Sequence, residues 1–250
     1  MRWSGSGTRW FSGHAHPNRA NPRPRIPTRG PKGLPVDGSS TSDAFVRIAS
    51  VVTETDAEGP GRRFAVWTQG CTIRCDGCFN PQMWTGNGGQ MVAVDILVEQ
   101  IRAADVEGLT ILGGEPFEQA LPLSGLASAV QRLGLSVMTF TGHDYEHLKG
   151  PNAPLGAYGL LAHTDLLVDG RYVATQPDLV RPWVGSTNQR FRFLSSRYEH
   201  LADTLDDIPD RVEVRVGSDG EVSVNGWASV AQLDELLAGI SAPLGRGKIR

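Results

Sequence analysis

The sequence predicts an α/β fold in which strands and helices alternate along the chain. Short segments rich in β-branched residues end at glycine-containing turns, and apolar stripes with helical spacing lie between several of them. Strands joined in this way build right-handed βαβ units and a parallel sheet. Near the end of the chain, apolar residues alternate with charged ones, which predicts a C-terminal β-hairpin outside that pattern.

Composition divides the chain into three parts. Residues 1–43 are basic and rich in Pro, Gly and Ser, and their sparse apolar residues show no period. Such a segment cannot bury enough surface to offset its ordering entropy, so we expect a disordered tail. Dense prolines oppose the amphipathic helix of an organelle transit peptide, and the apolar region of a signal peptide is lacking. A start codon assigned too far upstream is the other interpretation. The core is expected at residues 44–200, and a hairpin–helix extension at 201–250.

The first two predicted strands lie on either side of a tight turn. Residues 45–52 are enriched in β-branched side chains, and Gly59-Pro60-Gly61 supplies the turn. The second strand covers residues 63–68 and ends where the cysteines begin. Because α/β sites form at the carboxyl ends of parallel strands, we expect the cysteine loop at the functional edge of the sheet.

The rest of the core is predicted to alternate helices with strands. The helix over residues 92–104 has apolar side chains at i, i+3, i+4 and i+7, counted from Val94. A second helix over residues 118–133 stops at Gly134. The other expected elements are strands at residues 109–112, 136–140 and 165–169 and a short helix at 144–148.

The extension is expected to hold a hairpin and a helix. Residues 212–216 alternate Val with charged side chains, residues 218–220 form a turn, and residues 222–224 pair back. Ser229 then caps a last helix, with Gln232 at the capping-box position.

Charge and hydropathy give no support for two classes of partner. The net charge of −3 and the pI near 6.1 give no indication of nucleic-acid binding or of a membrane surface. No apolar run approaches the roughly 20 residues of a membrane span. We therefore expect no nucleic acid and no membrane among the partners.

All three cysteines fall in one short stretch, at Cys71, Cys75 and Cys78, with the spacing C-x3-C-x2-C. Iron–sulfur clusters are held by cysteine thiolates, normally four, so this loop suits a [4Fe–4S] cluster with one iron left for another ligand. A structural zinc site is the second interpretation, but its nearest downstream histidine would be His143. An odd number of cysteines opposes a disulfide framework. Unrelated or redox thiols are the remaining interpretation.

Further fixed residue types frame the cysteines at Gly59, Gly61, Arg63, Gly70 and Asn80. Together with the cysteines they resemble the signature G-x-G-x-K/R-x3-F-x2-G-C-x3-C-x2-C-x-N of the radical S-adenosylmethionine (SAM) enzymes that activate glycyl radical enzymes. Trp67 stands where that pattern has Phe. Gly77 stands where many radical SAM enzymes carry an aromatic residue, as it does in the anaerobic ribonucleotide reductase activases, the subfamily that this chain most resembles.

A second motif, Gly113-Gly114-Glu115-Pro116, directly follows the strand predicted at residues 109–112. In radical SAM enzymes a GGEP motif at this place contacts the amino group of SAM. An ammonium needs carbonyl and carboxylate acceptors, and glycines allow the backbone to approach it closely. The alternative is an ordinary strand-to-helix turn in which Glu115 is an acid favoured by the helix dipole.

Later segments also resemble the activases. They lie at residues 139–142, 165–172 and 183–190. In the family, a basic residue two positions after the Asp that ends the fourth strand reaches the SAM carboxylate. Arg171 holds that position after Asp169, and a guanidinium suits bidentate carboxylate binding. The alternative for Arg171 is an exposed turn arginine, and for Asn188 and Gln189 there is resemblance without a physical explanation.

The resemblance covers residues 45–192 and implies an open, partial (β/α)6 barrel whose open edge admits a loop of a protein substrate. It implies reductive cleavage of SAM at the open iron to a 5′-deoxyadenosyl radical. That radical takes hydrogen from a backbone glycine of a partner glycyl radical enzyme of the anaerobic ribonucleotide reductase type. The implied cofactors are the [4Fe–4S] cluster and SAM, the implied electron donor is a flavodoxin or ferredoxin, and an oxygen-sensitive cluster implies a reducing cytoplasm.

Three other functions are open at this point. A radical SAM enzyme acting on a small molecule or a ribosomal peptide shares the same core, although peptide maturases usually add cysteine-rich domains. A deazapurine ring-contraction enzyme has a similar size. A non-enzymatic electron-transfer protein would ligate its cluster fully and would not need the GGEP loop.

Overall fold

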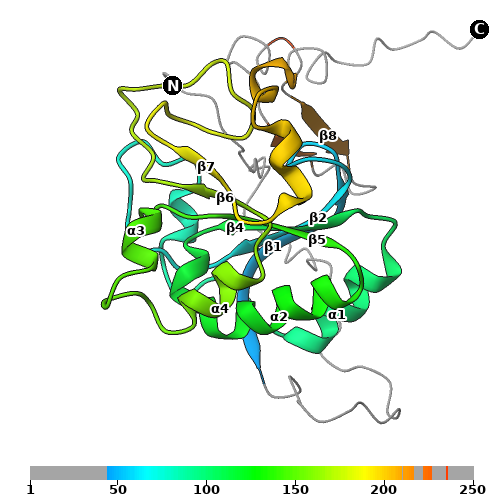
Figure 1. The fold of residues 1–250 in the computed structure, drawn as a ribbon. Coiled ribbons are helices and arrows are strands. Elements are labelled where there is room, and N and C mark those ends of the chain that lie inside the picture. Colours follow the sequence, from blue (N-terminus) through cyan, green and yellow to red (C-terminus); the bar gives the residue numbers. More distant parts are fainter. Residues whose placement is uncertain (1–43, 210, 217–221, 227–234, 236–250) are drawn as a thin grey trace, which may run out of the picture.

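The computed structural model describes residues 44–209, 211–216, 222–226 and 235 (Figure 1). The predicted tail at residues 1–43 lies outside them, as does the helix predicted to start at Ser229, apart from Glu235, which is helical. None of the helices in these described ranges has the length and apolar character needed to cross a membrane.

The core is a mixed sheet with the strand order β3-β1-β2-β4-β5-β6-β7. Its strands are β1 (Phe45–Thr55), β2 (Arg63–Thr68), β3 (Gln90–Ala93), β4 (Gly108–Gly113), β5 (Ser136–Phe140), β6 (Leu166–Asp169) and β7 (Arg190–Phe193). The central strands β2, β4, β5 and β6 are parallel neighbours, as the βαβ pattern predicts.

The outer strands correct the prediction of a wholly parallel sheet. β1 pairs antiparallel with β2, and β7 pairs antiparallel with β6. For β1 the reason is the connection, because a parallel crossover needs a dozen or more residues and usually a helix, whereas a short turn joins β1 to β2. The short strands β3 and β7 were not predicted at all.

Helices α1, α2 and α4 cover one face of the sheet (Figure 1). The helices are α1 (Val94–Ala103), α2 (Ala120–Arg132), α3 (Tyr145–Leu148) and α4 (Ala157–Ala162), with short 3-10 turns η1 (Pro81–Met83), η2 (Pro116–Gln119), η3 (Ser196–Leu201) and η4 (Leu205–Asp207). Phe64 and Val66 of β2 pack in the main core with residues of these helices, whereas Ala65 and Trp67 belong to a smaller cluster. Alternate residues of β2 therefore point to opposite faces of the sheet, one set into the core under the helices and the other into the smaller cluster.

The arginine of the first sequence motif is buried inside the sheet rather than at its functional edge. Arg63 is fully buried, and its guanidinium donates to the hydroxyls of Thr110, Ser136 and Tyr198 and to the Leu109 carbonyl. Burial lowers the pKa of Arg63, against the opposing influence of Tyr198. Neutral oxygen acceptors thus satisfy a buried cation that ties β2 to β4, β5 and η3.

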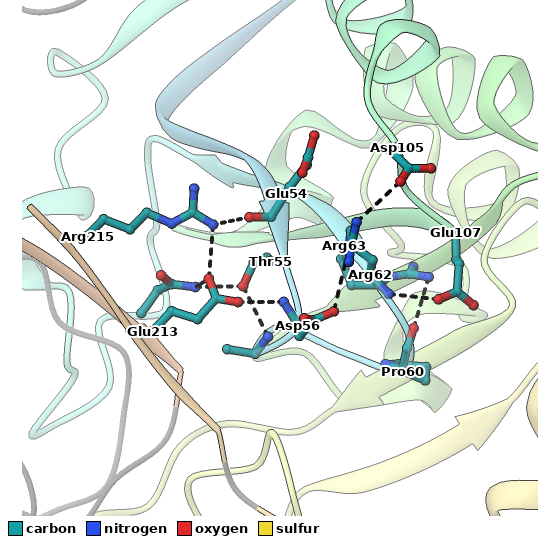
Figure 2. Close-up of polar contacts among 12 residues, drawn as sticks. Glu54, Thr55, Asp56, Pro60, Arg62, Arg63, Asp105, Glu107, Glu213 and Arg215 are labelled. Carbon is teal, nitrogen blue, oxygen red and sulfur yellow. Dashed lines mark hydrogen bonds and ion pairs between the residues drawn. The ribbon is translucent and has the colours of Figure 1, made fainter. Parts of the chain in front are cut away.

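The C-terminal hairpin is present as predicted, with strands β8 (Val212–Val216) and β9 (Val222–Gly226) pairing antiparallel. It docks on the β1–β2 connection (Figure 2). The Glu213 carboxylate accepts from the Asp56 N–H at 2.7 Å, and Arg215 donates to the Glu54 carbonyl. The buried amide of Asn225 donates to the Thr55 hydroxyl at 2.8 Å. The described part of the extension is therefore joined to the core by polar contacts.

Candidate functional site

The cysteine loop starts at the carboxyl end of β2, as predicted. Cys71, Cys75 and Cys78 are free thiols, each half-buried. The segment around η1 supports the start of the loop, because the Gly70 N–H donates to the Met83 carbonyl at 2.8 Å and the Cys71 N–H to the Trp84 carbonyl at 3.1 Å.

Three residues of this region adopt left-handed backbone conformations. Gly70 and Gly77 have φ of 105° and 76°, and Arg74 has φ of 50°, which is uncommon for a residue with a side chain. A Cβ atom at position 77 would approach the Ala174 Cβ to 3.0 Å and the Tyr172 ring to 3.6 Å. The segment after β6 therefore leaves little room for a side chain at position 77.

The thiols lie near backbone donors. Burial raises the pKa of the Cys71 thiol, against the backbone N–H groups of Arg74 and Ile73, which favour the thiolate. Burial also raises the pKa of Cys75, against the Tyr172 backbone and the Arg171 guanidinium. Hydrogen-bond donors and positive charges close to a sulfur stabilise its thiolate, which is the form that binds a metal.

The GGEP motif lies directly against the cysteine loop. The Gly114 N–H donates to the Thr68 carbonyl and the Glu115 N–H to the Gly70 carbonyl, both at 2.8 Å. A Cβ atom at Gly114 would come within 2.2 Å of the Gly70 oxygen, and one at Gly113 within 2.5 Å of the Thr68 nitrogen. Only glycines at both positions allow the end of β4 to approach the end of β2 this closely.

Glu115 is buried and bound to the chain itself. Its carboxylate accepts from the Phe117 N–H, the Thr141 hydroxyl and the Gly142 N–H, each at 2.9 Å. Burial raises the pKa of Glu115 to about 7, against those three donors. Glu115 also precedes η2, which begins at Pro116. The side chain therefore joins the end of β4 to the end of β5, and it caps a short turn as the alternative interpretation expected.

Glu118, which the sequence reasoning missed, fixes the cysteine loop from η2. One oxygen of its carboxylate accepts from both the backbone N–H and the hydroxyl of Thr72, each at 2.6 Å. Next to it, the Gln119 amide donates to the carbonyls of Arg47 and Gln69. Acids and amides in a first helical turn are common, so the sequence alone gave no signal that these two side chains reach β1 and the loop.

Arg171 reaches the cysteine loop from the segment after β6. Its guanidinium donates to the Ile73 carbonyl at 2.8 Å and to the Arg74 carbonyl at 3.3 Å. Asn188 donates to the carbonyl of Arg171 at 2.8 Å, and Gln189 donates to that of Gly170 at 3.2 Å. These contacts supply the physical explanation that the sequence lacked for Asn188 and Gln189.

Asn80 lies at the end of the cysteine loop, directly before η1. Its side-chain oxygen accepts from the Gln82 amide at 3.1 Å, and its carbonyl accepts from the Met83 N–H at 2.9 Å. The residue lines a cavity that it shares with Cys78 and Gly113.

That cavity has a volume of about 170 Å³ and lies at the carboxyl ends of β2, β4 and β5. Aromatic side chains dominate its lining, and Trp183 among them has φ of 63°, a strained conformation for a bulky residue. The lining residues are Glu58, Trp67, Cys78, Phe79, Asn80, Leu112, Gly113, Phe140, Tyr172, Trp183, Gly185 and Gln189. The structure thus brings the cysteine loop, the GGEP motif and the segment after β6 to one edge of the sheet.

A family model described as a 4Fe-4S single cluster domain matches residues 57–192, more than half of the chain. The chain belongs to this family. The anaerobic ribonucleoside-triphosphate reductase-activating protein of Haemophilus influenzae is 30% identical over 143 residues, which are 52% of this chain and 87% of that protein. The protein of the same name from Enterobacteria phage T4 is 29% identical over 139 residues, covering 53% and 84% of the two chains.

A second kind of relative matches a shorter part. The pyruvate formate-lyase-activating enzyme of Listeria monocytogenes is 42% identical over 84 residues, which are 31% of this chain and 34% of that enzyme. These similarities confirm the prediction that the chain is a radical SAM activating enzyme whose cofactors are a [4Fe–4S] cluster and SAM. Among solved structures, QueE from Escherichia coli aligns with a TM-score of 0.32 and 18% identity over 39% of this chain and 52% of that one, a similarity too low to establish a shared fold.

The cysteine loop fits such a cluster. Its three thiols are unpaired, share one loop and, at Cys71 and Cys75, face backbone donors. Across the described ranges, no three or more His, Cys, Asp or Glu side chains are grouped so as to hold a metal ion. A [4Fe–4S] cluster does not need its thiolates to converge on one point, because each binds a different iron.

Proposed function

We propose that this protein generates a glycyl radical on a partner enzyme of the anaerobic ribonucleotide reductase type. The cluster and SAM, when bound, supply reductive cleavage to a 5′-deoxyadenosyl radical that removes hydrogen from the substrate. The observation that carries the proposal is the convergence of the cysteine loop, the GGEP motif and Arg171 at one edge of the sheet, in a chain whose relatives bear the names of activating proteins.

The residues at this edge have separate tasks in the proposal. Cys71, Cys75 and Cys78 hold the cluster, and the same three thiolates make it catalytic. The backbone of Gly113 and Gly114, with Pro116 fixing the turn, would present carbonyl acceptors to the SAM ammonium, because glycines at both positions let the end of β4 lie directly against the start of the cysteine loop.

Three polar side chains complete the proposed SAM site. Glu115 holds the ends of β4 and β5 at a fixed separation and would supply a carboxyl acceptor for the ammonium. Asn80 lines the cavity beside Cys78, where its amide can bind a polar group of SAM. Arg171, whose guanidinium reaches the cysteine loop, would donate to the SAM carboxylate.

The finer architecture belongs to the proposal too. We infer an open, partial (β/α)6 barrel, because the outermost strands β3 and β7 do not pair with each other in the described sheet. An open edge suits a substrate that arrives as a polypeptide loop and not as a small molecule. We also propose a flavodoxin or ferredoxin as electron donor and, because the cluster is expected to be oxygen-sensitive, a reducing cytoplasm as location.

The test mixes the reduced protein, SAM and a candidate glycyl radical enzyme without oxygen. A doublet electron-spin signal should appear on the partner and should vanish when the partner's reacting glycine is changed to alanine. Cys78→Ala should lose the signal together with iron, whereas Glu115→Ala should keep iron and weaken SAM binding.

Two outcomes would redirect the assignment. If SAM is cleaved while every glycyl radical enzyme of the same genome stays silent, the substrate is a small molecule or a peptide. If the reduced protein passes electrons but neither binds nor cleaves SAM, it is an electron-transfer protein.

A further inference from the structure

Arg171 is exposed to solvent, yet its guanidinium is committed to the cysteine loop. One nitrogen, Nη2, donates to the carbonyls of both Ile73 and Arg74, which lie between the first two cluster cysteines. Those two carbonyls belong to the part of the loop where Arg74 has its left-handed conformation. The contact spans almost a hundred residues of sequence, so it holds two separate segments of the chain together.

The backbone that carries Arg171 is itself fixed by two side-chain amides. Asn188 donates to the carbonyl of Arg171, and Gln189 donates to the carbonyl of Gly170. The Gln189 oxygen in turn accepts from two backbone N–H groups in the preceding turn, at 2.8 and 3.1 Å. Both the nitrogen and the oxygen of the Gln189 amide therefore bind backbone of the protein itself, which fits a structural role.

The hydrogen bonds of Arg171 place the guanidinium against the two residues that directly precede Cys75, one of the three cysteines that would hold the cluster. Reduction adds one negative charge to an iron–sulfur cluster. A fixed positive charge close to the cluster stabilises the reduced form more than the oxidised form, because net charge is a determinant of cluster potential.

We propose that Arg171 is a positioning residue for the cluster, which holds the Cys71–Cys75 segment and raises the reduction potential, and that Asn188 and Gln189 keep it in place. This role rests on the presence of the cluster and not on the identity of the protein substrate. It differs from binding of the SAM carboxylate, because it operates before SAM arrives.

The experiment measures iron content and the midpoint potential of the reconstituted cluster by electron-spin titration without SAM. Arg171→Gln should lower the ratio of reduced to oxidised cluster at a fixed potential by about fivefold, the size expected when one charge is lost in a solvent-exposed setting. Arg171→Lys keeps the charge and should recover most of that loss. The matched control is Arg190→Gln, which removes an exposed arginine at the start of β7.

The second variant is Asn188→Ala, which frees the backbone of Arg171 without removing a charge. It should shift the potential in the same direction by less, and combining it with Arg171→Gln should add nothing further, because Asn188 acts through Arg171. If Arg171→Gln takes up no iron, the shift in Asn188→Ala decides the matter.

Two results would overturn the proposal. One is a wild-type potential in both Arg171→Gln and Asn188→Ala, with only SAM affinity reduced in the former. The other is an equal shift in Arg190→Gln, which would reduce the effect to net charge. Neither result depends on glycyl radical formation, so the proposed function can stand or fall separately.

Discussion

Replacing Gly114 by alanine tests whether close approach of the GGEP backbone builds the cysteine loop. The new Cβ would lie 2.2 Å from the Gly70 oxygen, 2.9 Å from its carbonyl carbon and 3.1 Å from its nitrogen. All three atoms are backbone, so no flexible side chain can move aside. The end of β4 and the start of the cysteine loop must therefore separate.

The cost follows from what that separation breaks. The hydrogen bonds from the Gly114 N–H to Thr68 and from the Glu115 N–H to Gly70 both cross the contact. Each contributes about 0.5–1.5 kcal/mol, and relieving an overpacked contact costs a further 1–3 kcal/mol or so. We expect Gly114→Ala to lower the free energy of unfolding by about 2–4 kcal/mol and to impair cluster binding.

Anaerobic urea unfolding of the cluster-free protein measures the stability, and iron content after reconstitution measures the site. The matched control is Gly86→Ala, because a Cβ at that glycine would have no heavy atom within 4 Å. The reasoning is refuted if the two variants unfold within about 0.5 kcal/mol of each other, the spread typical of neutral surface changes, and bind iron equally.

Three further changes test other parts of the structure. The pKa of Glu115 is about 7 in the folded protein against an ordinary 4.5, so its contribution to stability is full below pH 4.5 and is lost as pH rises through 7. Between those pH values the free energy of unfolding of the wild type should fall by about 3 kcal/mol more than that of Glu115→Gln. Urea unfolding of the cluster-free protein measures the difference. Glu118→Ala removes the acceptor of both Thr72 donors, so a chelator should extract iron about three to ten times faster. Asn225→Ala deletes the buried bond to Thr55 and should weaken hairpin docking by about 1–2 kcal/mol, visible as faster hydrogen exchange in β8 and β9 but not in β4.

Much of the core could be predicted because its strands are buried on both faces. β2 and β5 occur with the predicted bounds, and every residue of β2 is buried, as in a strand that is covered on both faces. β7 has the sequence Arg-Phe-Arg-Phe and only four residues, which is too short a period to detect. The antiparallel direction of β1 follows from the short turn before β2, which the prediction of a parallel sheet did not take into account.

In the site, too, the residues that belong to local sequence patterns could be predicted and the others could not. Cysteine spacing and a glycine pair are local patterns, and the residues they identified do meet at one edge of the sheet. The roles of Glu118, Asn188 and Gln189 depend on backbone carbonyls and N–H groups 3 to 46 residues away, and a backbone group has no sequence signature. Side chains that bind distant backbone are therefore the part of a site that spacing cannot reveal.

The signature that frames the cysteines combines two physical tasks at opposite ends of β2, and substitutions should separate them. Gly61 precedes β2 with φ of 71°, and a Cβ there would lie 2.7 Å from the Glu107 carboxylate, which accepts from the Arg62 N–H. Gly61→Ala should therefore cost about 1–2 kcal/mol in unfolding free energy, because a left-handed conformation is unfavourable for alanine and the carboxylate must move. Its iron content per folded chain should stay at the wild-type level. Cys75→Ala should do the reverse, losing the cluster while the half-buried thiol costs the cluster-free fold little. If Gly61→Ala loses iron without losing stability, the two ends of β2 are not independent and the first half of the signature belongs to the cluster site.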